Sequence, residues 1–315
     1  MQIVVLDAKT LANTDLTPIA KLGTLTSYDM TAYEDILSRC ENAEVIITNK
    51  VKLDAKLIAS LPKLKLICVA ATGVNNIELE AAKAHHVAVA NVAGYSTPSV
   101  VQHTFTMLGN LMTNIHRYQQ DCQAGRWQQS PMFCRLDYDI SEIAGKHFVI
   151  IGHGALGEAV ANVAKAFGAK VIIAERKGAT QVRNGRMAFT EALRIADIVS
   201  IHCPLTAETE NLIDDAEFAA LQGHAFIINT ARGGIVNEQA LVNALNNNQI
   251  AGAAVDVLTH EPARTDNPLV NYQGDNLLLT PHIAWASKEA IARLVNEIAL
   301  NINAFASGTD RNRVV

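Results

Sequence analysis

The stretch HFVIIGHGALGEAVANVAKAFGAKVIIAER, residues 147–176, contains the pattern that decides the fold. An apolar run leads directly into three glycines with the spacing G-x-G-x-x-G, and a helix-like segment and a second β-branched run follow. A strand, a glycine turn, a helix and a second strand in this order are typical of a βαβ unit that binds a dinucleotide. We therefore predict a dinucleotide-binding unit here, and a glycine turn with a purely structural role is the alternative.

Each of the three glycines has a mechanical reason at its position. Gly152 permits the tight turn off the strand, Gly154 lets the backbone approach a pyrophosphate, and Gly157 lets the helix pack close to the sheet. The helix that begins at Ala155 and Leu156 brings unpaired N–H groups and a positive dipole end to the phosphates. These five residues are the predicted phosphate-binding turn.

The second strand of this unit ends at an acid that indicates which dinucleotide is bound. Glu175 lies 18 residues after Gly157, where a carboxylate accepts hydrogen bonds from the hydroxyls of the adenosine ribose. The same carboxylate repels a 2′-phosphate, so the sequence favours NAD over NADP. Arg176 follows directly, and NADP stays open as the alternative because an arginine there can pair with a 2′-phosphate.

Composition narrows the class of protein. The 315 residues carry a net charge of −5, and 49% of them are hydrophobic, which suits two domains of about 150 residues each. No basic block is present, so neither nucleic acid nor an anionic membrane is expected as a partner. No apolar run approaches the roughly 18 residues of a membrane span, and the first residues lack the basic opening of a secretion signal. The five cysteines show no C-x-x-C spacing, which predicts reduced thiols in a cytoplasmic protein and no metal site.

Two series of short apolar runs alternate with helix-like segments, and this alternation predicts two parallel sheets that helices cover on both faces. The first series comprises residues 3–7, 43–49, 64–70 and 86–91. The second series comprises residues 146–151, 170–174, 196–201, 224–229, 250–257 and 276–280. The sequence thus predicts four strands in the first domain and six in the second.

The connection between the two series sets the predicted domain boundaries. Gly94 and Pro98 interrupt the pattern, and a long helix is expected from about Ser99. A last helix pattern, residues 287–308, is expected to return to the first domain and make it discontinuous. We predict a substrate or catalytic domain from residues 1–98 plus 286–315, and a dinucleotide-binding domain from residues 99–285.

Polar side chains stand at three predicted strand ends of the second domain. Arg232 follows one strand, Asp256 and Glu261 belong to the end of the next, and His282 follows the last. Pro281 has a fixed φ and no N–H group, so that strand must stop before His282. Each residue alone has a simpler explanation as a surface cation, a turn former, a loop carboxylate or a loop histidine. Because ligands of doubly wound sheets bind outside the carboxyl ends of the strands, we expect these side chains to meet beside the nicotinamide.

Such a group of side chains meets the needs of hydride transfer to a 2-keto acid. Reduction of the carbonyl needs a proton donor, and the imidazolium of His282 suits this role near neutral pH. A carboxylate partner such as Glu261 would fix the tautomer of the ring and stabilise its protonated form. Arg232 would bind the substrate carboxylate through two hydrogen bonds, and Asp256 would accept a hydrogen bond from the carboxamide of the cofactor.

The chain resembles the D-isomer-specific 2-hydroxyacid dehydrogenases over nearly its whole length. The resemblance rests on the stretches ATGVNNIE (71–78), GHGALG (152–157), HCPLTAETENLI (202–213), NTARGGIVNE (229–238), DVLTHEP (256–262) and PHIAW (281–285). It implies an α/β fold with two doubly wound parallel-sheet domains. One is a flavodoxin-like catalytic domain built from both chain ends, and the other is a Rossmann NAD-binding domain.

The resemblance also implies roles for individual residues. Arg232, Glu261 and His282 match the catalytic residues of that family. Backbone amides near Gly73 and Val74 are expected to bind the substrate carboxylate, together with Arg232 and His282. Further residues expected beside NAD are Thr104, Cys203, Pro204, Thr230 and Ala231.

Two stretches point to a subgroup of the family. NVAGYSTPSVVQHTFTML (91–108) and RWQQSPMF (126–133) most resemble glycerate dehydrogenases, which are also called hydroxypyruvate reductases. We therefore expect glycerate and hydroxypyruvate, or glyoxylate, as substrates. D-lactate, a branched hydroxy acid or phosphoglycerate is the alternative within the same mechanism. An NAD-sensing interaction protein, like the corepressors built on this fold, is the alternative from another class.

Two further expectations concern the segment that joins the domains. Relatives commonly dimerise through it, here residues 110–145, so a homodimer is expected. For His103, on the connecting helix, the pattern favours no chemical role, and a place beside the cofactor is the alternative.

Overall fold

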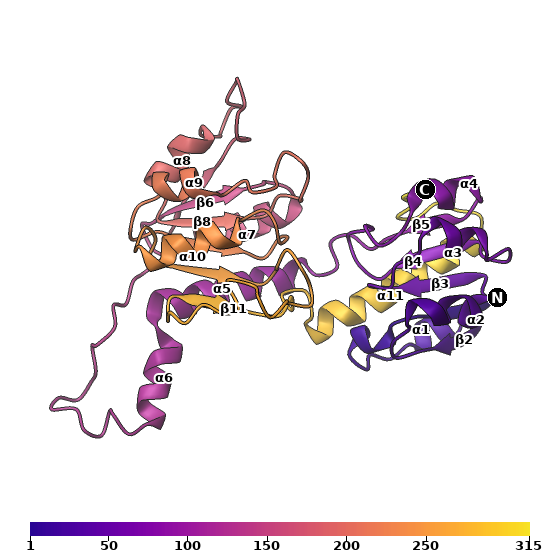
Figure 1. Ribbon diagram of the computed structural model, residues 1–315, viewed down its shortest axis with the longest axis horizontal. Helices are drawn as coiled ribbons and strands as arrows, with labels where there is room; N and C mark the ends of the chain where they lie inside the picture. Colours follow the sequence, from indigo (N-terminus) through magenta and orange to yellow (C-terminus); the bar gives the residue numbers. More distant parts are fainter. The chain divides into compact units, whose positions relative to one another are not determined.

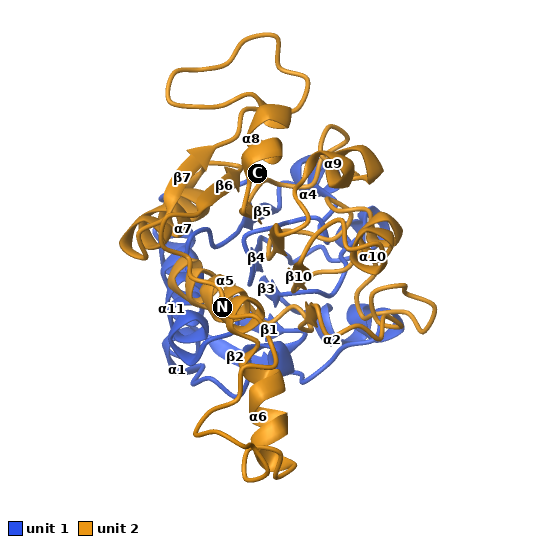
Figure 2. Ribbon diagram, turned by 90° about the vertical axis from the view of Figure 1, so that its left-hand side faces the viewer, with its two compact units in different colours: residues 1–96, 285–315 blue, residues 97–284 orange.

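The computed structural model describes residues 1–315, which divide into two compact units (Figure 1; Figure 2). Unit 1 comprises Met1–Ser96 and Trp285–Val315, and unit 2 comprises Thr97–Ala284. The predicted boundaries, after residue 98 and after residue 285, lie two residues and one residue further along the chain. Each unit contains one parallel sheet with helices, so the predicted α/β class is confirmed.

The sheet of unit 1 has five parallel strands in the flavodoxin-like order β2-β1-β3-β4-β5. The strands are β1 (Gln2–Val5), β2 (Thr24–Ser27), β3 (Val45–Thr48), β4 (Leu66–Val69) and β5 (Ala88–Ala90). β3, β4 and β5 are buried along their whole length, as strands covered on both faces should be.

Short helices cover both faces of this sheet. They are η1 (Ala8–Leu11), α1 (Thr17–Ala20), η2 (Tyr33–Asp35), α2 (Ile36–Cys40), α3 (Ala55–Ala59) and α4 (Leu79–Ala84). Alternate strand residues form two cores: Ile3 and Ile47 pack on the face of α1, and Val4 and Ile46 pack on the face of α2, α3 and α4.

The helix α11 (Lys288–Ala306) belongs to unit 1. Its buried residues Ile291, Leu294, Val295 and Ile298 recur at the spacing of one helix face. They pack in the same core as β1, β3 and β4. The C-terminal segment therefore completes one face of the sheet that the N-terminal residues begin.

The sheet of unit 2 has six parallel strands in the order β11-β10-β9-β8-β6-β7. The strands are β6 (His147–Ile151), β7 (Lys170–Ile173), β8 (Ile198–Ile201), β9 (Phe226–Asn229), β10 (Gly252–Val255) and β11 (Leu277–Leu279). The chain runs from β6 to β7 on one side and then crosses to β8 on the other side of β6. This reversal places a switch point at the carboxyl end of β6, where doubly wound sheets bind ligands.

The helices of unit 2 divide between the two faces of its sheet (Figure 1). They are α5 (Thr97–Thr113), α6 (Ile115–Gln123), α7 (Ala155–Ala166), α8 (Phe189–Ile195), α9 (Asp215–Ala220) and α10 (Glu238–Asn246). One core joins α5 and α7 to the sheet, and another joins α8, α9 and α10 to it. No helix in the chain combines the length and the apolar character needed to cross a membrane.

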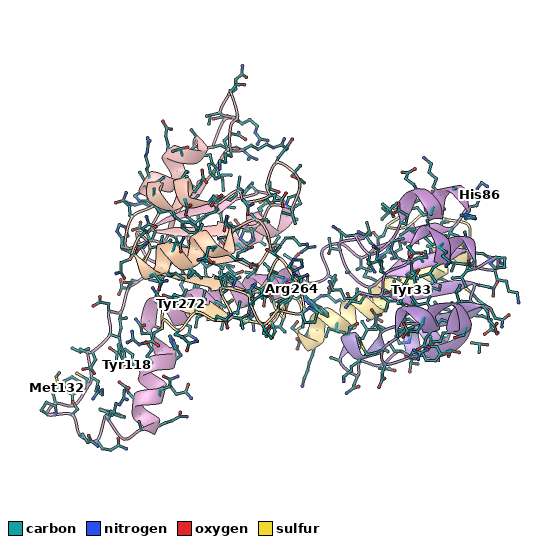
Figure 3. All side chains as sticks on the ribbon, viewed as in Figure 1. Tyr33, His86, Tyr118, Met132, Arg264 and Tyr272 are labelled. Atoms are coloured by element: carbon teal, nitrogen blue, oxygen red, sulfur yellow. The ribbon has the colours of Figure 1, made fainter.

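α6 and the segment after it extend away from the sheet of unit 2 as an arm, on which Figure 3 labels Tyr118 and Met132. We call residues 115–140 the arm. No regular element follows α6 until β6, and the turns are held by side chains instead. The buried carboxylate of Asp121 accepts hydrogen bonds from Arg126 at 2.5 Å and from the hydroxyl of Tyr138 at 3.1 Å. The arm therefore has a polar centre of its own.

Candidate active site

The glycine turn follows β6 and leads into α7. Gly152 has a φ of +90°, and a Cβ atom there would lie 2.5 Å from the backbone nitrogen of Cys203. A Cβ atom on Gly157 would lie 2.1 Å from the carbonyl oxygen of Gly152, which is too close for any other residue. A Cβ atom on Gly154 would meet nothing within 4 Å. The first and third glycines therefore serve close packing, whereas the second faces open space.

The start of α7 fits the phosphates of a dinucleotide. Gly154 is the N-cap residue and has no side chain to cap the first turn, and Ala155 and Leu156 follow as the first helical residues. The first amides of a helix have no acceptor within it, so they are available to an anionic ligand. The turn also lies at the switch point of the sheet. Both observations fit the predicted pyrophosphate site, and the individual contacts with NAD stay predictions.

The residues after β8 lie against the glycine turn. The amide of His202 donates to the carbonyl oxygen of Ile151 at 2.7 Å, and Cys203 and Pro204 follow. Burial raises the pKa of the Cys203 thiol, which keeps the thiol protonated near neutral pH. Sequence reasoning did not single out His202. Its Nε2 lies 2.8 Å from the hydroxyl of Ser200, and burial lowers the pKa of the ring to about 4.

Thr104 on α5 and Thr230 after β9 meet inside unit 2. Their hydroxyl oxygens lie 3.3 Å apart, and the hydroxyl of Thr104 also donates to the carbonyl oxygen of Val100 at 2.8 Å. Ala231 follows Thr230, and its amide donates to the side-chain oxygen of Asn229 at 3.1 Å. Thr104 exposes no surface and Thr230 exposes 7%. The expected contacts of Thr104, Thr230 and Ala231 with NAD stay predictions.

Arg232 is exposed on the loop after β9. Its Nη1 donates to the carbonyl oxygen of Ala231 at 2.7 Å, and Asn229 Nδ2 donates to the carbonyl oxygen of Arg232 at 2.9 Å. A Cβ atom on Gly233 would lie 2.0 Å from the carbonyl oxygen of Leu258. The Arg232 loop therefore packs directly against the loop after β10, which carries Glu261.

His282 and Glu261 form the closest histidine–carboxylate pair of unit 2. The Nδ1 of His282 lies 2.6 Å from Oε2 of Glu261, and Oε1 of the same carboxylate accepts the amide of Leu258 at 2.9 Å. Their side chains are 25% and 34% exposed, so both groups can meet a ligand from solvent. The structure thus brings together two of the three predicted catalytic side chains, and it sets the loop of Arg232 beside them.

Asp256 holds the turn that presents His282. Its carboxylate accepts the amides of Ile283 and Ala284, each at 2.9 Å, and the hydroxyl of Thr280 at 2.6 Å. His103 Nε2 lies 3.1 Å from the Thr280 hydroxyl and 3.5 Å from the Asp256 carboxylate. Burial acts to raise the pKa of Asp256, but hydrogen bonds from His103, Thr280 and the two amides outweigh it and lower the pKa.

Two predictions from sequence are affected by this network. Asp256 was expected to contact the cofactor carboxamide, and the structure gives its 1%-exposed carboxylate a structural task that sequence reasoning missed. That contact stays a prediction. His103 contacts Thr280 and Asp256, which hold the turn before and after His282. A place beside the cofactor stays the alternative for His103.

Glu175, after β7, is buried among arginines. Arg183 donates from Nε to Oε2 at 2.7 Å and from Nη2 to Oε1, and the amide of Arg176 donates to Oε1 at 2.8 Å. The hydrogen bonds from Arg183 hold the pKa of Glu175 well below its usual range. Sequence reasoning placed this acid at a ribose and noted Arg176, but it missed Arg183.

Gly73 and Val74 lie in unit 1, in the loop after β4. The carbonyl oxygen of Val74 accepts the amide of Ile77 at 3.0 Å, whereas the amides of Gly73 and Val74 donate to no acceptor in the chain. Two adjacent amides without an acceptor suit an anion such as a carboxylate. Their role in substrate binding stays a prediction.

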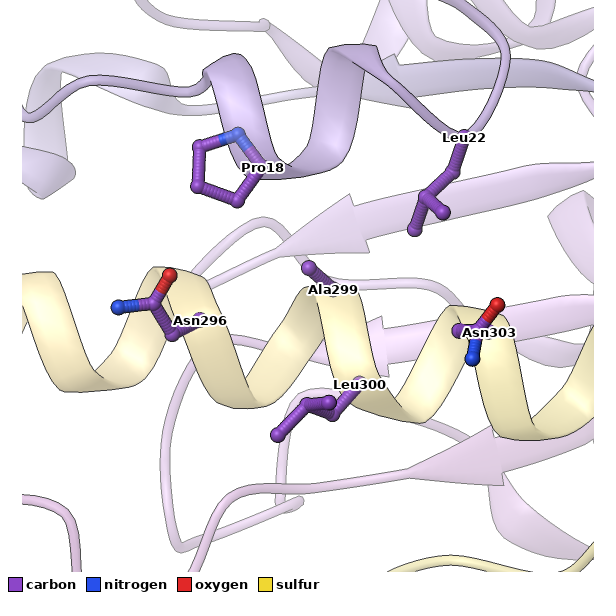
Figure 4. Close-up of a pocket in the computed structure, with 6 residues that line it drawn as sticks. All are labelled: Pro18, Leu22, Asn296, Ala299, Leu300 and Asn303. Carbon is purple, nitrogen blue, oxygen red and sulfur yellow. The ribbon is translucent and has the colours of Figure 1, made fainter.

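Other surface features do not compete with this site. Figure 4 shows a hollow in unit 1 between α1 and α11, lined by Pro18, Leu22, Asn296, Ala299, Leu300 and Asn303. None of these side chains is an acid, a base or a nucleophile. No group of three or more His, Cys, Asp or Glu side chains is arranged to hold a metal ion.

Comparison with known proteins identifies the family and the fold of this chain. Residues 105–284 match the model of the D-isomer specific 2-hydroxyacid dehydrogenase NAD binding domain. The chain is 38% identical to a glycerate dehydrogenase of Methylorubrum extorquens over 281 residues, 89% of this chain and 88% of that one. It is 34% identical to a hydroxypyruvate reductase of Blautia hydrogenotrophica over 322 aligned positions, 100% of this chain and 99% of that one. A solved acyclic imino acid reductase, in complex with NADPH and D-Arg, matches with a TM-score of 0.86 and 27% identity over 100% of both chains.

A doubly wound sheet that carries a glycine turn and a His–Glu pair after the carboxyl ends of its strands is typical of an oxidoreductase that uses a nicotinamide cofactor. The chain belongs to the D-isomer specific 2-hydroxyacid dehydrogenase family. It is an NAD-dependent enzyme that transfers a hydride between the nicotinamide and a small 2-hydroxy acid or 2-keto acid.

Proposed function

We propose that the enzyme interconverts hydroxypyruvate and D-glycerate, and that glyoxylate is a second acceptor. The relatives named glycerate dehydrogenase and hydroxypyruvate reductase, which align with most of the chain, support this substrate class. The observation that carries the chemistry is the 2.6 Å contact between His282 Nδ1 and Glu261 Oε2. It supplies an acid–base pair on a loop that adjoins the loop of Arg232.

The proposed mechanism assigns one task to each of these side chains. The residues at the glycine turn would hold NADH, which when bound would supply the hydride for the carbonyl carbon. Arg232 binds the substrate carboxylate through its guanidinium and polarises the neighbouring carbonyl. The planar guanidinium suits this role because two of its N–H groups can donate to one carboxylate. His282 gives a proton from Nε2 to the carbonyl oxygen, and Glu261 holds the ring through Nδ1 and stabilises the imidazolium. In the oxidation direction His282 takes the proton of the hydroxyl group.

We further propose that two backbone groups of unit 1 bind the substrate. The amides of Gly73 and Val74, which have no acceptor within the chain, suit the substrate carboxylate. Asp256 acts through the backbone: it fixes the turn after His282 and thus the direction of the ring.

A panel of 2-keto acids tests the substrate class. With NADH as reductant, the loss of NADH absorbance should give a kcat/KM for hydroxypyruvate at least about tenfold above that for pyruvate, because a pocket that hydrogen-bonds a substrate hydroxyl rejects the analogue without it. Faster turnover of pyruvate would favour the D-lactate alternative. A failure to reduce any 2-keto acid would overturn the proposed function.

We also propose that the arm pairs with a second copy of this chain. Large apolar side chains project from it into solvent: Trp127 is 53% exposed, Phe133 90% and Leu136 70%. Apolar groups gathered on a segment that organises itself around Asp121 are typical of a protein interface. The substitution Phe133→Asp should convert a dimer into a monomer in light scattering after gel filtration. A wild-type chain that is monomeric at micromolar concentration would contradict this proposal.

A cytoplasmic location is the remaining proposal. All five cysteines are free thiols, and Cys40 and Cys68 are buried as thiols. This usage is typical of a reducing compartment. Fractionation of cells with an antibody against the chain tests the location, and enrichment outside the cytoplasmic fraction would contradict it.

A further inference from the structure

The carboxylate of Glu175 has no acceptor capacity left for a ribose. Its Oε1 accepts the Arg176 amide at 2.8 Å and Arg183 Nη2, and its Oε2 accepts Arg183 Nε at 2.7 Å and the Arg183 amide at 3.2 Å. A carboxylate offers about four lone-pair sites, two on each oxygen. All four are occupied by the chain itself. A ribose diol would therefore have to displace Arg183 before it could bind this acid.

Local chain geometry brings Arg183 to this position. The segment after β7 turns back at Gly185, which has a φ of +75°, and pairs with the end of β7. The amide of Glu175 donates to the carbonyl oxygen of Met187 at 2.8 Å, and the amide of Met187 donates to that of Ile173 at 2.9 Å. Arg183 is thus held by backbone pairing as well as by the ion pair.

The guanidinium of Arg183 has further N–H groups that Glu175 does not use. Arginine carries five N–H groups, of which Arg183 uses Nε–H and one on Nη2 for Glu175. No other partner takes the remaining three, and the side chain is 53% exposed. Glu175 therefore orients Arg183 rather than presenting its own charge to solvent.

The surroundings of this pair are positively charged. Arg186 Nη1 lies 3.9 Å from Glu175, and the exposed Arg176 side chain has no ion-pair partner. Lys177 is engaged by Glu217 at 2.8 Å. No acidic residue lies between Glu175 and Glu191. Arg183 thus neutralises the carboxylate, Arg186 lies near it, and Arg176 follows it in the chain. This excess of positive charge attracts a phosphate dianion.

We propose that this enzyme binds NADPH as well as NADH, and that Arg183, held by Glu175, binds the 2′-phosphate of the adenosine ribose. The proposal deepens the proposed function and rests on it, because the dinucleotide must lie along the glycine turn for its ribose to reach the end of β7. It takes up the alternative that the sequence left open at Arg176, and it assigns the 2′-phosphate to Arg183 instead. Glu175 is here a positioning residue for Arg183.

Calorimetric titration of the full chain with NADH and with NADPH tests the proposal. The wild-type dissociation constant for NADPH should lie within about tenfold of that for NADH. Arg183→Gln should weaken NADPH by at least about tenfold, since it removes a charge-assisted bidentate donor, and should weaken NADH by less than about threefold. The control Arg194→Gln removes the same charge from the exposed end of α8 and should change neither constant by more than about threefold.

A second measurement needs no variant and keeps the proposal testable if Arg183→Gln fails to fold. Wild-type binding of adenosine 2′,5′-bisphosphate is compared with that of 5′-AMP, and the added phosphate should leave the affinity unchanged or increase it. The inference would be overturned if NADPH bound more than about tenfold more weakly than NADH, or if the bisphosphate bound more than about tenfold more weakly than 5′-AMP. Neither result would affect the proposed function. Equal weakening of NADH and NADPH by Arg183→Gln would overturn the inference as well. A chain that binds neither dinucleotide would overturn the proposed function itself.

Discussion

His282 takes a backbone conformation that a side chain seldom adopts. Its φ is +54°, in the left-handed region, which costs a non-glycine residue roughly 1–2 kcal/mol. The two amides that follow donate to the buried Asp256, and charge-assisted hydrogen bonds of this kind offset such a cost. The sequence predicted that Pro281 would end the strand before His282. It did not predict that an acid at the end of the neighbouring strand would hold the turn, because that contact depends on the pairing of β10 with β11.

At the residue scale, substitutions of His282 and Glu261 should lower kcat by different amounts. His282→Ala should lower kcat by roughly 10²–10⁴, the usual contribution of a general acid, while NADH binding in a fluorescence titration stays unchanged. Glu261→Gln keeps a hydrogen-bond acceptor and removes the charge, so its loss of kcat should be smaller. His85→Ala, on the surface of unit 1, is the matched control. Turnover by His282→Ala at the wild-type rate would show that another group donates the proton.

The buried ring of His202 predicts a pH dependence of stability. Burial lowers its pKa from 6.5 to about 4, so the folded state disfavours the proton that the unfolded chain binds below pH 6.5. The contribution of this group to stability is therefore complete above pH 6.5 and falls as the pH decreases from 6.5 to 4, by on the order of 1 kcal/mol per pH unit. Glu175 also has a lowered pKa, and its contribution is lost in a more acidic range, below its ordinary value of 4.5.

Urea unfolding at a series of pH values measures this effect. His202→Gln should remove most of the slope between pH 6.5 and 4 while leaving the loss below pH 4.5 that belongs to Glu175. An unchanged slope in the variant would mean that other groups account for the acid sensitivity.

At the scale of elements, the sequence predicted the apolar strands of both sheets but missed the exposed strand β2. All six predicted strands of unit 2 and all four of unit 1 are present; each is shorter than predicted, and β1 begins one residue before its predicted run. β2 was missed because Thr24–Ser27 is an edge strand with polar, mostly exposed residues, so it lacks the apolar run on which the prediction depends. α5 begins at Thr97 instead of about Ser99, since Pro98 is favourable in the first turn of a helix.

The turn between β6 and α7 gives a matched pair of substitutions. Gly157→Ala places a methyl group 2.1 Å from the Gly152 carbonyl oxygen, so it should destabilise unit 2 by about 1–3 kcal/mol or more. Gly154→Ala meets open space, and its φ of −90° suits alanine, so the fold should be unaffected. The same methyl group would stand where the phosphates approach, and NADH should bind at least about tenfold more weakly.

Thermal unfolding and calorimetric titration of both variants distinguish these effects. Normal NADH binding by Gly154→Ala would contradict the placement of the pyrophosphate at this turn. Normal stability of Gly157→Ala would show that α7 can shift away from β6 without loss.

The candidate site was predictable to the extent that its residues follow strand ends. Arg232, Glu261 and His282 could be assembled from sequence because parallel strands share one carboxyl edge. The partners of Glu175 could not be predicted from the sequence. Arg183 contacts Glu175 because it lies on an irregular segment, and the backbone pairing of that segment has no sequence signature. The same holds for His202, whose buried position follows from packing around the switch point.

At the scale of the whole molecule, the two units have separate hydrophobic cores, and the acid–base pair belongs to only one of them. The sheet of unit 1 is completed by residues from the C-terminal end, while the acid–base pair and the glycine turn lie within unit 2. A change in the core of one unit should therefore leave the other intact. Chains with more than one domain often unfold in more than one step, and separate cores can open independently.

The substitution Ile298→Ala tests this independence on α11. Ile298 is fully buried against β1, β3 and β4, so its truncation should destabilise unit 1 by about 2–5 kcal/mol. Leu300→Ala, on the same helix but 48% exposed, is the control and should cost far less. Differential scanning calorimetry should show two transitions, of which Ile298→Ala lowers one and leaves the other, and NADH binding below the first transition should persist. A single transition that shifts as a whole would show that the two units unfold together, because the loss of one core would then be transmitted to the other.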